Sequence, residues 1–275
     1  MPAVLITGAR QGIGWAASER LADAGWEVYA GVRDEASMKR IADSNARITP
    51  VQLDITDPAH IAALERVLPQ KLGAVVNNAA FALLGPIESL SLADLRSQFE
   101  VNLLGSVAVT QAVLPRLRAA QGRIVFVSST GGRSVVPMEG AYCSSKFAIE
   151  GVADALRVEL RPWGVKVVVV EPGPTNTEAW QGVNGMIEDM ENRLSSEHRR
   201  LYAQHVSGLR QNVARFATVA ASPALAGKVI ERALTAKLPR ARYLVGGPAH
   251  MLIAMNALLP TRLGDAIGAR IAGLR

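Results

Sequence analysis

Tyr142 and Lys146 lie four residues apart in the stretch that begins at Ser128, and this pair could perform acid–base chemistry. On a helix, residues at this spacing share a face, with Cβ atoms about 5–6 Å apart. An ammonium beside a phenol favours the phenolate, so we expect Lys146 to lower the pKa of Tyr142. Ser129 ends the apolar run IVFVSS, and its thirteen-residue distance from Tyr142 favours it over Ser128 as a partner. A hydroxyl, an activated phenol and a lysine suit proton transfer to or from a substrate oxygen.

A glycine-rich turn follows the first apolar run of the chain and reads TGARQGIG over residues 7–14. Glycines let the backbone turn sharply and approach a pyrophosphate, and the N-terminus of the next helix offers N–H groups to its charge. Alone, such a pattern could be a plain tight turn. After the first strand of a β-α-β unit, however, it predicts dinucleotide binding.

The elements that must position these residues are short apolar runs separated by helical patterns. The runs are Val4–Thr7, Glu27–Val32, Ile48–Leu53, Ala74–Asn77, Arg123–Ser128, Lys166–Glu171 and Tyr243–Val245. Their alternation with helices predicts an α/β fold, a Rossmann-like doubly wound parallel sheet of about seven strands with helices on both faces. We expect a single domain over residues 1–275, with a substrate-loop insertion at about 176–221 and a helical tail at about 248–275.

The composition of the 275 residues is that of a soluble globular protein, with 49% hydrophobic and 20% charged residues. A single cysteine, Cys143, excludes an internal disulfide, and no signal peptide or membrane-spanning run is apparent, so we expect a cytoplasmic protein. The net charge of +6 is dispersed and aromatic residues make up only 5%, which argues against nucleic-acid binding. The four histidines have no metal-ligand spacing, so no metal site is predicted.

Taken together, these motifs resemble the classical short-chain dehydrogenases/reductases. The glycine turn, NNA at residues 77–79, Ser129, the Tyr142–Lys146 pair and PG at residues 172–173 occur in the order of that family. The resemblance covers roughly the first 180 residues. The segments YCSSKFAIEG and VYAGVRD are most similar to the branch that holds hydroxysteroid and retinol dehydrogenases. One departure is Ala80, because the family usually has glycine after NNA.

The resemblance implies a mechanism in which a hydride moves between a nicotinamide and a carbonyl or carbinol carbon. Tyr142 would supply or remove the proton on oxygen, and Ser129 would orient that oxygen. Lys146 would lower the pKa of Tyr142 and hold the nicotinamide ribose. Asn102 would anchor a water that links Lys146 to solvent; the alternative is a buried amide bonded within its own helix.

Cofactor choice depends on the end of the second predicted strand. An acid there bonds the ribose 2′-hydroxyl of NAD, whereas an arginine accommodates the 2′-phosphate of NADP. Arg33 follows the strand directly and Arg10 could add a second cation, so NADP(H) is favoured over NAD(H). Asp34 is the competing signal, since it lies about twenty residues beyond the glycines. Arg33 could also be a merely solvated loop charge.

Further cofactor contacts follow from the resemblance alone. Asp54 would accept a hydrogen bond from the adenine amino group, or otherwise cap the next helix. Thr177 would bond the carboxamide, or otherwise be an ordinary loop hydroxyl. The full implied set of cofactor-binding residues is Gly8, Arg10, Gly12, Ile13, Gly14, Arg33, Asp54, Asn78, Ala79, Tyr142, Lys146, Pro172, Gly173 and Thr177.

The expected function is an NADP(H)-dependent interconversion of an alcohol with a ketone or aldehyde on an apolar substrate, such as a steroid, a retinoid or a long-chain carbonyl compound. The alternatives are a broad reductase of small carbonyl compounds and a non-catalytic NADP(H)-binding sensor or scaffold. The intact set of Asn102, Ser129, Tyr142 and Lys146 argues against the sensor. A sugar-nucleotide epimerase is disfavoured, because such relatives resemble longer chains with a different glycine pattern.

The C-terminal tail carries much of the net charge, with five arginines and one acid from Arg240 onward. It also holds six apolar side chains before Pro260, namely Met251, Leu252, Ile253, Met255, Leu258 and Leu259. A helix on a membrane surface is one interpretation. The favoured one is a helix that packs over the substrate cleft or against a second subunit. The resemblance further implies a homodimer or homotetramer.

Overall fold

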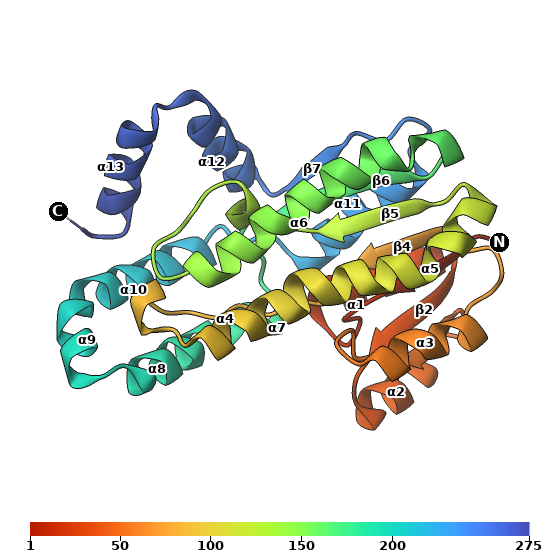
Figure 1. The fold of residues 1–275 in the computed structure, drawn as a ribbon, viewed down its shortest axis with the longest axis horizontal. Helices are drawn as coiled ribbons and strands as arrows, with labels where there is room; N and C mark the ends of the chain where they lie inside the picture. The colour runs from red at the N-terminus through yellow and green to blue at the C-terminus, as the bar shows by residue number, and fades with distance from the viewer. Residues whose placement is uncertain (275) are drawn as a thin grey trace.

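A seven-stranded parallel sheet forms the centre of the molecule in the computed structural model, which describes residues 1–274 (Figure 1). The strand order is β3-β2-β1-β4-β5-β6-β7, and every neighbouring pair is parallel. The strands are β1 (Ala3–Ile6), β2 (Glu27–Val32), β3 (Ile48–Gln52), β4 (Ala74–Asn77), β5 (Arg123–Val127), β6 (Lys166–Pro172) and β7 (Arg242–Val245). The predicted doubly wound sheet is confirmed, and each strand ends within one residue of its predicted limits.

Two layers of helices cover the sheet, which explains why the strands are apolar throughout. Along β1, Val4 and Ile6 face one layer, while Ala3 and Leu5 face the other. The first layer comprises α1 (Gly12–Asp23), α2 (Glu35–Ala42) and α11 (Pro223–Thr235). The second comprises α3 (Pro58–Val67), α5 (Ser106–Ala120) and α6 (Gly140–Glu159), and it lies in front of the sheet in Figure 1.

The segment that enters α5 is irregular in a specific way. Helix α4 (Leu92–Phe99) continues into a π-helical turn, Glu100–Gly105, before α5 begins. Such wide turns occur mostly as single turns within α-helices, frequently at functional sites. Short 3₁₀ turns also occur at Ile87–Ser89, Thr130–Gly132 and Arg161–Trp163.

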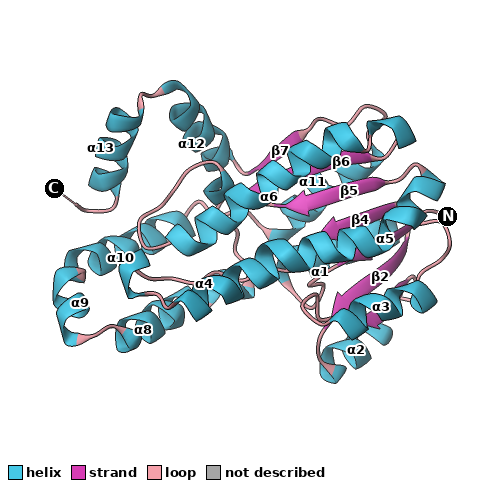
Figure 2. Cartoon of the chain, viewed as in Figure 1, coloured by secondary structure: helices cyan, strands magenta, loops and turns pink. Residues whose placement is uncertain are grey.

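The predicted insertion at 176–221 is helical rather than an irregular loop (Figure 2). Its helices are α7 (Glu178–Gln181), α8 (Val183–Arg193), α9 (Ser196–Leu201) and α10 (Ala203–Ala217). Their buried apolar side chains form a separate cluster with Leu84 and Met138, which come from loops beside the sheet. We call these four helices and the cluster beneath them the lid.

Two helices form the tail, α12 (Gly247–Leu258) and α13 (Thr261–Ile271). The end of α13 packs on α10 so closely that a Cβ on Gly208 would overlap the carbonyl oxygen of Ala272. Gln204 of α10 also donates a hydrogen bond to the Gly273 carbonyl at 2.6 Å. The side chains of Leu252 and Met255 lie outside what the structure describes. No helix of the described residues is long and apolar enough to cross a membrane.

Candidate active site

The residues of the predicted proton-transfer site meet at the carboxyl edge of the sheet. Ser129 follows the end of β5, and Tyr142 and Lys146 lie in the first turns of α6. Asn102 enters from the π-helical turn. In open parallel sheets, ligands bind outside this edge of the strands.

Ser129 and Tyr142 both border Gly131. A Cβ on Gly131 would lie 3.4 Å from both Ser129 Oγ and Tyr142 Cε1. Ser128 instead points beneath the loop, because its Oγ lies 2.6 Å from the position of a Cβ on Gly132. The structure therefore brings Ser129, rather than Ser128, to Tyr142, as the spacing predicted.

The pKa of Tyr142 is raised, and the prediction that Lys146 lowers it is wrong for this structure. Burial of the phenol is the largest cause, the hydrogen bond with Ser129 opposes it, and the charge of Glu139 adds to it. Lys146 Nζ donates to the Val127 carbonyl at 2.9 Å and lies 5.7 Å from the centre of the Tyr142 ring. The amine thus engages β5 and the ring face instead of the phenol oxygen.

Lys146 is itself buried, and burial lowers the pKa of its amine to about 8. The charge of Glu150, one helical turn further along α6, raises that pKa and so works against burial. A group with a pKa near 8 can exchange a proton close to neutral pH.

Asn102 is buried, but it does not bond within its own helix, so that alternative is wrong. Its Oδ1 accepts from the Phe81 N–H at 3.0 Å, and its Nδ2 donates to the Phe81 carbonyl at 2.9 Å. The same Nδ2 donates to Ser145 Oγ at 3.0 Å, and that hydroxyl donates to the Tyr142 carbonyl at 2.7 Å. Asn102 thus ties the loop after β4 to the helix that carries Tyr142. Sequence reasoning missed Ser145, because a serine between motif residues carries no signal of its own.

The glycine turn at residues 7–14 has a backbone that residues other than glycine rarely adopt. Gly8 and Gly12 have φ values of +64° and +59°. A Cβ on Gly14 would lie 2.5 Å from the Gly8 carbonyl oxygen and 2.6 Å from Asn78 Nδ2. Each glycine is therefore required by conformation or by space.

Two polar side chains hold this turn against the end of β4. Asn78 Nδ2 donates to the carbonyls of Thr7 and Gly8 at 3.0 and 3.1 Å. Thr7 Oγ1 accepts from the N–H groups of Asn78 and Ala79, both at 3.0 Å. No side chain caps the N-terminus of α1, so its N–H groups remain available to an anion. This cradle fits the pyrophosphate of a dinucleotide.

The arginines predicted to read the 2′-phosphate lie on the surface, and Arg10 lies beside Asp34. Asp34 caps α2 by accepting from the N–H and the hydroxyl of Ser37, both at 2.8 Å. These hydrogen bonds lower the pKa of Asp34. A third cation was missed by sequence reasoning: Arg40 donates to the Arg10 carbonyl and stacks on Trp15, 4.8 Å from the ring centre.

Asp54 does not cap the next helix, so this alternative is wrong; Asp57 does, by accepting from the Ala59 N–H at 2.8 Å. Asp54 Oδ1 instead accepts from the N–H and hydroxyl of Thr56 at 2.9 and 2.7 Å. Burial works to raise the pKa of Asp54, but these hydrogen bonds and the charge of Arg33 hold it below its usual value.

The last two predicted cofactor segments lie near the glycine turn and at the end of β6. Thr177 caps α7 by accepting from the Trp180 N–H at 3.2 Å, and its Cγ2 is 3.1 Å from the position of a Cβ on Gly12. Thr177 is therefore a helix cap that also borders the glycine turn. Gly173 donates to the Val245 carbonyl at 3.2 Å, which fixes the Pro172-Gly173 bend to β7.

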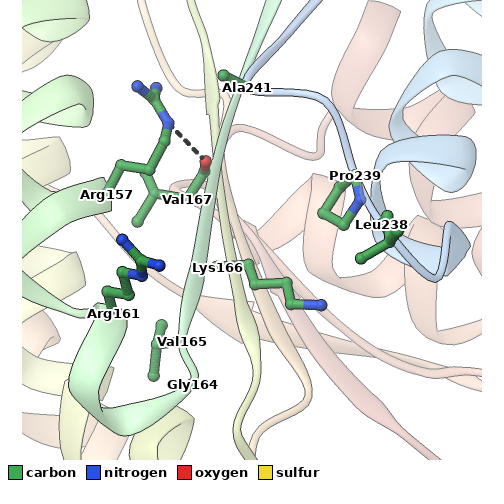
Figure 3. A pocket seen from close by; sticks show the side chains of 9 residues that line it. All are labelled: Arg157, Arg161, Gly164, Val165, Lys166, Val167, Leu238, Pro239 and Ala241. Carbon is green, nitrogen blue, oxygen red and sulfur yellow. Dashed lines mark hydrogen bonds between the residues drawn. The ribbon is translucent and has the colours of Figure 1, made fainter.

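A cavity of about 400 Å³ lies away from these residues, at the start of β6 (Figure 3). It is lined by Arg157, Arg161, Gly164, Val165, Lys166, Val167, Leu238, Pro239 and Ala241. Lys166 begins β6, whereas Ser129 follows the end of β5, which runs parallel to β6. The cavity therefore lies at the amino ends of the strands, opposite the carboxyl ends where Ser129 lies. Among the described residues, no group of three histidine, cysteine or acidic side chains could hold a metal ion.

A parallel sheet with a glycine-rich turn between its first strand and the next helix is the arrangement of dinucleotide-binding α/β proteins. The sequence profile described as "short chain dehydrogenase" matches residues 2–188, and the chain belongs to this family. It is therefore an NAD(P)-dependent short-chain dehydrogenase/reductase.

Characterised relatives match almost the whole chain. An "NADPH-dependent 3-dehydrocapnine reductase" of Ornithobacterium rhinotracheale is 38% identical over 96% of this chain and 94% of its own. Human "17-beta-hydroxysteroid dehydrogenase type 1" is 34% identical over 87% of this chain and 76% of its own. Mouse "Retinol dehydrogenase 7" is 33% identical over 96% of this chain and 86% of its own. A solved short-chain dehydrogenase of Burkholderia cenocepacia, in complex with NADP, has a TM-score of 0.75 at 25% identity and covers 98% of this chain and 97% of its own.

Proposed function

We propose that the protein is an NADP(H)-dependent oxidoreductase that interconverts an alcohol with a ketone or aldehyde on an apolar substrate. The observation that carries this proposal is the Ser129–Tyr142 pair at the carboxyl edge of the sheet, beside the glycine cradle. NADP(H), when bound, supplies or accepts the hydride. The residues of the chain bind the two reactants, orient the substrate oxygen and move the proton.

Tyr142 is the proposed acid. The phenol is protonated at neutral pH, as a tyrosine with an ordinary or a raised pKa is, and it has a proton to donate to a carbonyl oxygen. Ser129, which already hydrogen-bonds the phenol, would orient that oxygen. Lys146, whose pKa near 8 lies close to neutrality, would return a proton to the site, and Asn102 would hold the water that connects it to solvent.

The preference for NADP(H) is supported by the charges at the end of β2. Arg10 and Arg33 are exposed cations there, and Arg40 lies against the backbone of Arg10. Asp34 is engaged in the cap of α2, where both of its carboxylate oxygens accept hydrogen bonds from Ser37. A relative that is NADPH-dependent and a structural neighbour that binds NADP agree with this preference.

An apolar substrate is supported by the lid. Its buried cluster includes Met138, only four residues before Tyr142, and Leu84 from the loop after β4. Apolar side chains this close to Tyr142 favour a hydrophobic substrate over a small polar one. Relatives named for retinol and for a hydroxysteroid point the same way.

The test is NADPH oxidation against matched panels of carbonyl compounds. Retinal, steroid ketones and long-chain aldehydes should be reduced with higher kcat/KM than acetaldehyde and acetone. Equal rates for both panels would contradict the apolar substrate and leave a broad small-carbonyl reductase. NADPH binding with no turnover in either direction would contradict catalysis and favour a sensor or scaffold.

A further inference from the structure

Two carboxyl groups are buried together behind the candidate active site. Glu171, directly before Pro172 on β6, is 0% exposed, and the side chain of Glu150 on α6 is 8% exposed. Burying a charge is costly unless it is paired and hydrogen-bonded. The proposed mechanism uses neither of these groups.

One guanidinium joins both carboxyls to the last strand. Arg242 Nε on β7 lies 3.0 Å from Glu150 Oε2 and 3.3 Å from Glu171 Oε1, and its Nη2 lies 2.7 Å from Asp154 Oδ2. Arg133, from the loop after Ser129, approaches Glu171 Oε2 at 3.6 Å. The cluster therefore contacts the Ser129 loop, α6, β6 and β7.

Three carboxyl oxygens of this cluster lack a hydrogen-bond donor in the described part of the chain. Glu150 Oε1 and both carboxyl oxygens of Glu171 are buried and accept no hydrogen bond from the described residues. A proton on one of the two carboxyls supplies a missing donor, and the negative charge of Glu150 disfavours ionisation of Glu171. Burial and the charge of Glu150 accordingly raise the pKa of Glu171 to about 7.

Glu150 is also in contact with the loop that presents Ser129. A Cβ on Gly132 would lie 3.3 Å from Glu150 Cγ and 3.1 Å from the Lys146 carbonyl oxygen. The loop thus rests directly on α6 at Glu150. A displacement of Glu150 would therefore shift the loop that carries Ser129 and change the electrostatic field at the Lys146 amine.

We propose that Glu150 and Glu171 share one proton and, in that state, act as positioning residues that hold α6 against the Ser129 loop. The proposal rests on the proposed function only for its effect on catalysis. The charged groups that face the pair are Lys146 and Asp154 on α6, Arg133 on the loop and Arg242 on β7, and Arg157 pairs with Asp154. When the shared proton leaves, two negative charges remain together between α6 and β6, and their repulsion loosens the loop.

The pH dependence follows from the direction of the shift. The folded protein retains a proton on Glu171 up to about pH 7, whereas the ordinary pKa of a glutamate is 4.5. The folded state therefore loses stability as the pH rises from 4.5 to about 7. The value of kcat should fall by up to about tenfold per pH unit once the shared proton is lost.

The experiment compares the parent with Glu171→Gln, whose amide keeps the shape and supplies a permanent donor. In kcat measured from pH 5.5 to 9 with saturating NADPH and the best carbonyl substrate, the parent should show a decline with an apparent pKa near 7. Glu171→Gln should lose that decline. The matched control is Glu159→Gln, an exposed residue at the end of α6, which should keep the parental profile.

Two further measurements test the shared proton independently of catalysis. Chemical unfolding at pH 5 and pH 8 should show a loss of stability in the parent that is reduced in Glu171→Gln, and this arm needs no substrate. Infrared difference spectra should show a protonated carboxyl band in the parent at pH 6 that Glu171→Gln lacks. A parental kcat profile in a Glu171→Gln protein that still binds NADPH would overturn the positioning role. Absence of both the stability difference and the band would overturn the shared proton, whatever the fate of the proposed reaction.

Discussion

The cofactor cradle and the lid are built by opposite means. In the cradle, contacts come from residues close in sequence or from adjacent strands, and Gly8, Gly12 and Gly14 have no room or no conformational freedom for a side chain. In the lid, Met138 packs with Ile187 and Val206, residues about fifty to seventy positions away, through ordinary apolar contacts. The cradle therefore tolerates little change, while the lid can be repacked with other apolar side chains. Cofactor binding and substrate choice should accordingly respond to different substitutions.

Tyr142→Phe should have the largest effect: it should abolish most of the turnover while leaving both the cradle and the lid intact. Loss of the proton donor is expected to lower kcat by about 10²–10⁴-fold. NADPH affinity, measured by fluorescence titration, should change little, because the ring and its packing remain. Retained turnover would assign the proton to another group.

Arg33→Ala tests whether the cofactor cradle selects NADPH through its 2′-phosphate. Losing a charge-assisted contact with a phosphate should weaken NADPH by about 1.5–3 kcal/mol, while NADH binding stays nearly constant. Calorimetric titration with both cofactors measures the difference. An equal loss for both would contradict the 2′-phosphate role.

Gly14→Ala tests the rigidity of the cradle. The new methyl group would meet the Gly8 carbonyl and Asn78 Nδ2, at an expected cost of about 1–3 kcal/mol in unfolding free energy, with weaker NADPH binding. The control is Gly151→Ala on α6, where a Cβ meets no atom within 4 Å. That variant should be about 0.5–1 kcal/mol more stable, since alanine favours a helix more than glycine does. Similar stabilities for the two variants would show that the turn can relax.

Gly208→Ala should have the smallest effect and acts on the substrate side. The methyl group must displace the Ala272 carbonyl and so separate the tail from α10. If the tail covers the cleft, KM for an apolar carbonyl compound should change about two- to tenfold, or about 0.5–1.4 kcal/mol, with NADPH affinity unchanged. Unchanged kinetics together with new binding to anionic vesicles would favour the membrane interpretation of the tail.

The same contrast explains what the sequence could predict. The strands were located within one residue because strands buried on both faces are continuous apolar runs, such as VVVV in β6. The glycine turn is equally local. The lid helices were mistaken for an irregular segment because their apolar residues, such as Ile187 and Met190 on α8, form a narrow stripe among charged ones.

The electrostatic properties of the site could not be predicted from the sequence. Spacing placed Lys146 beside Tyr142, but the pKa of the phenol depends on how deeply later packing buries it. Likewise, Glu171 and Arg242 are 71 positions apart, and only the pairing of β6 with β7 brings them together.

The wide turn at residues 100–105 has a consequence for how this helix could change by insertion or deletion. A π-turn contains one residue more than an α-turn, so deleting a single position between Phe99 and Asn102 would restore a continuous α-helix. The same deletion would rotate Asn102 and the residues that follow it by about 100° relative to α4. The amide of Asn102 would then lose its alignment with Phe81 and Ser145. A regular α-helix over this segment is therefore incompatible with the Asn102 hydrogen bonds that join the loop after β4 to α6.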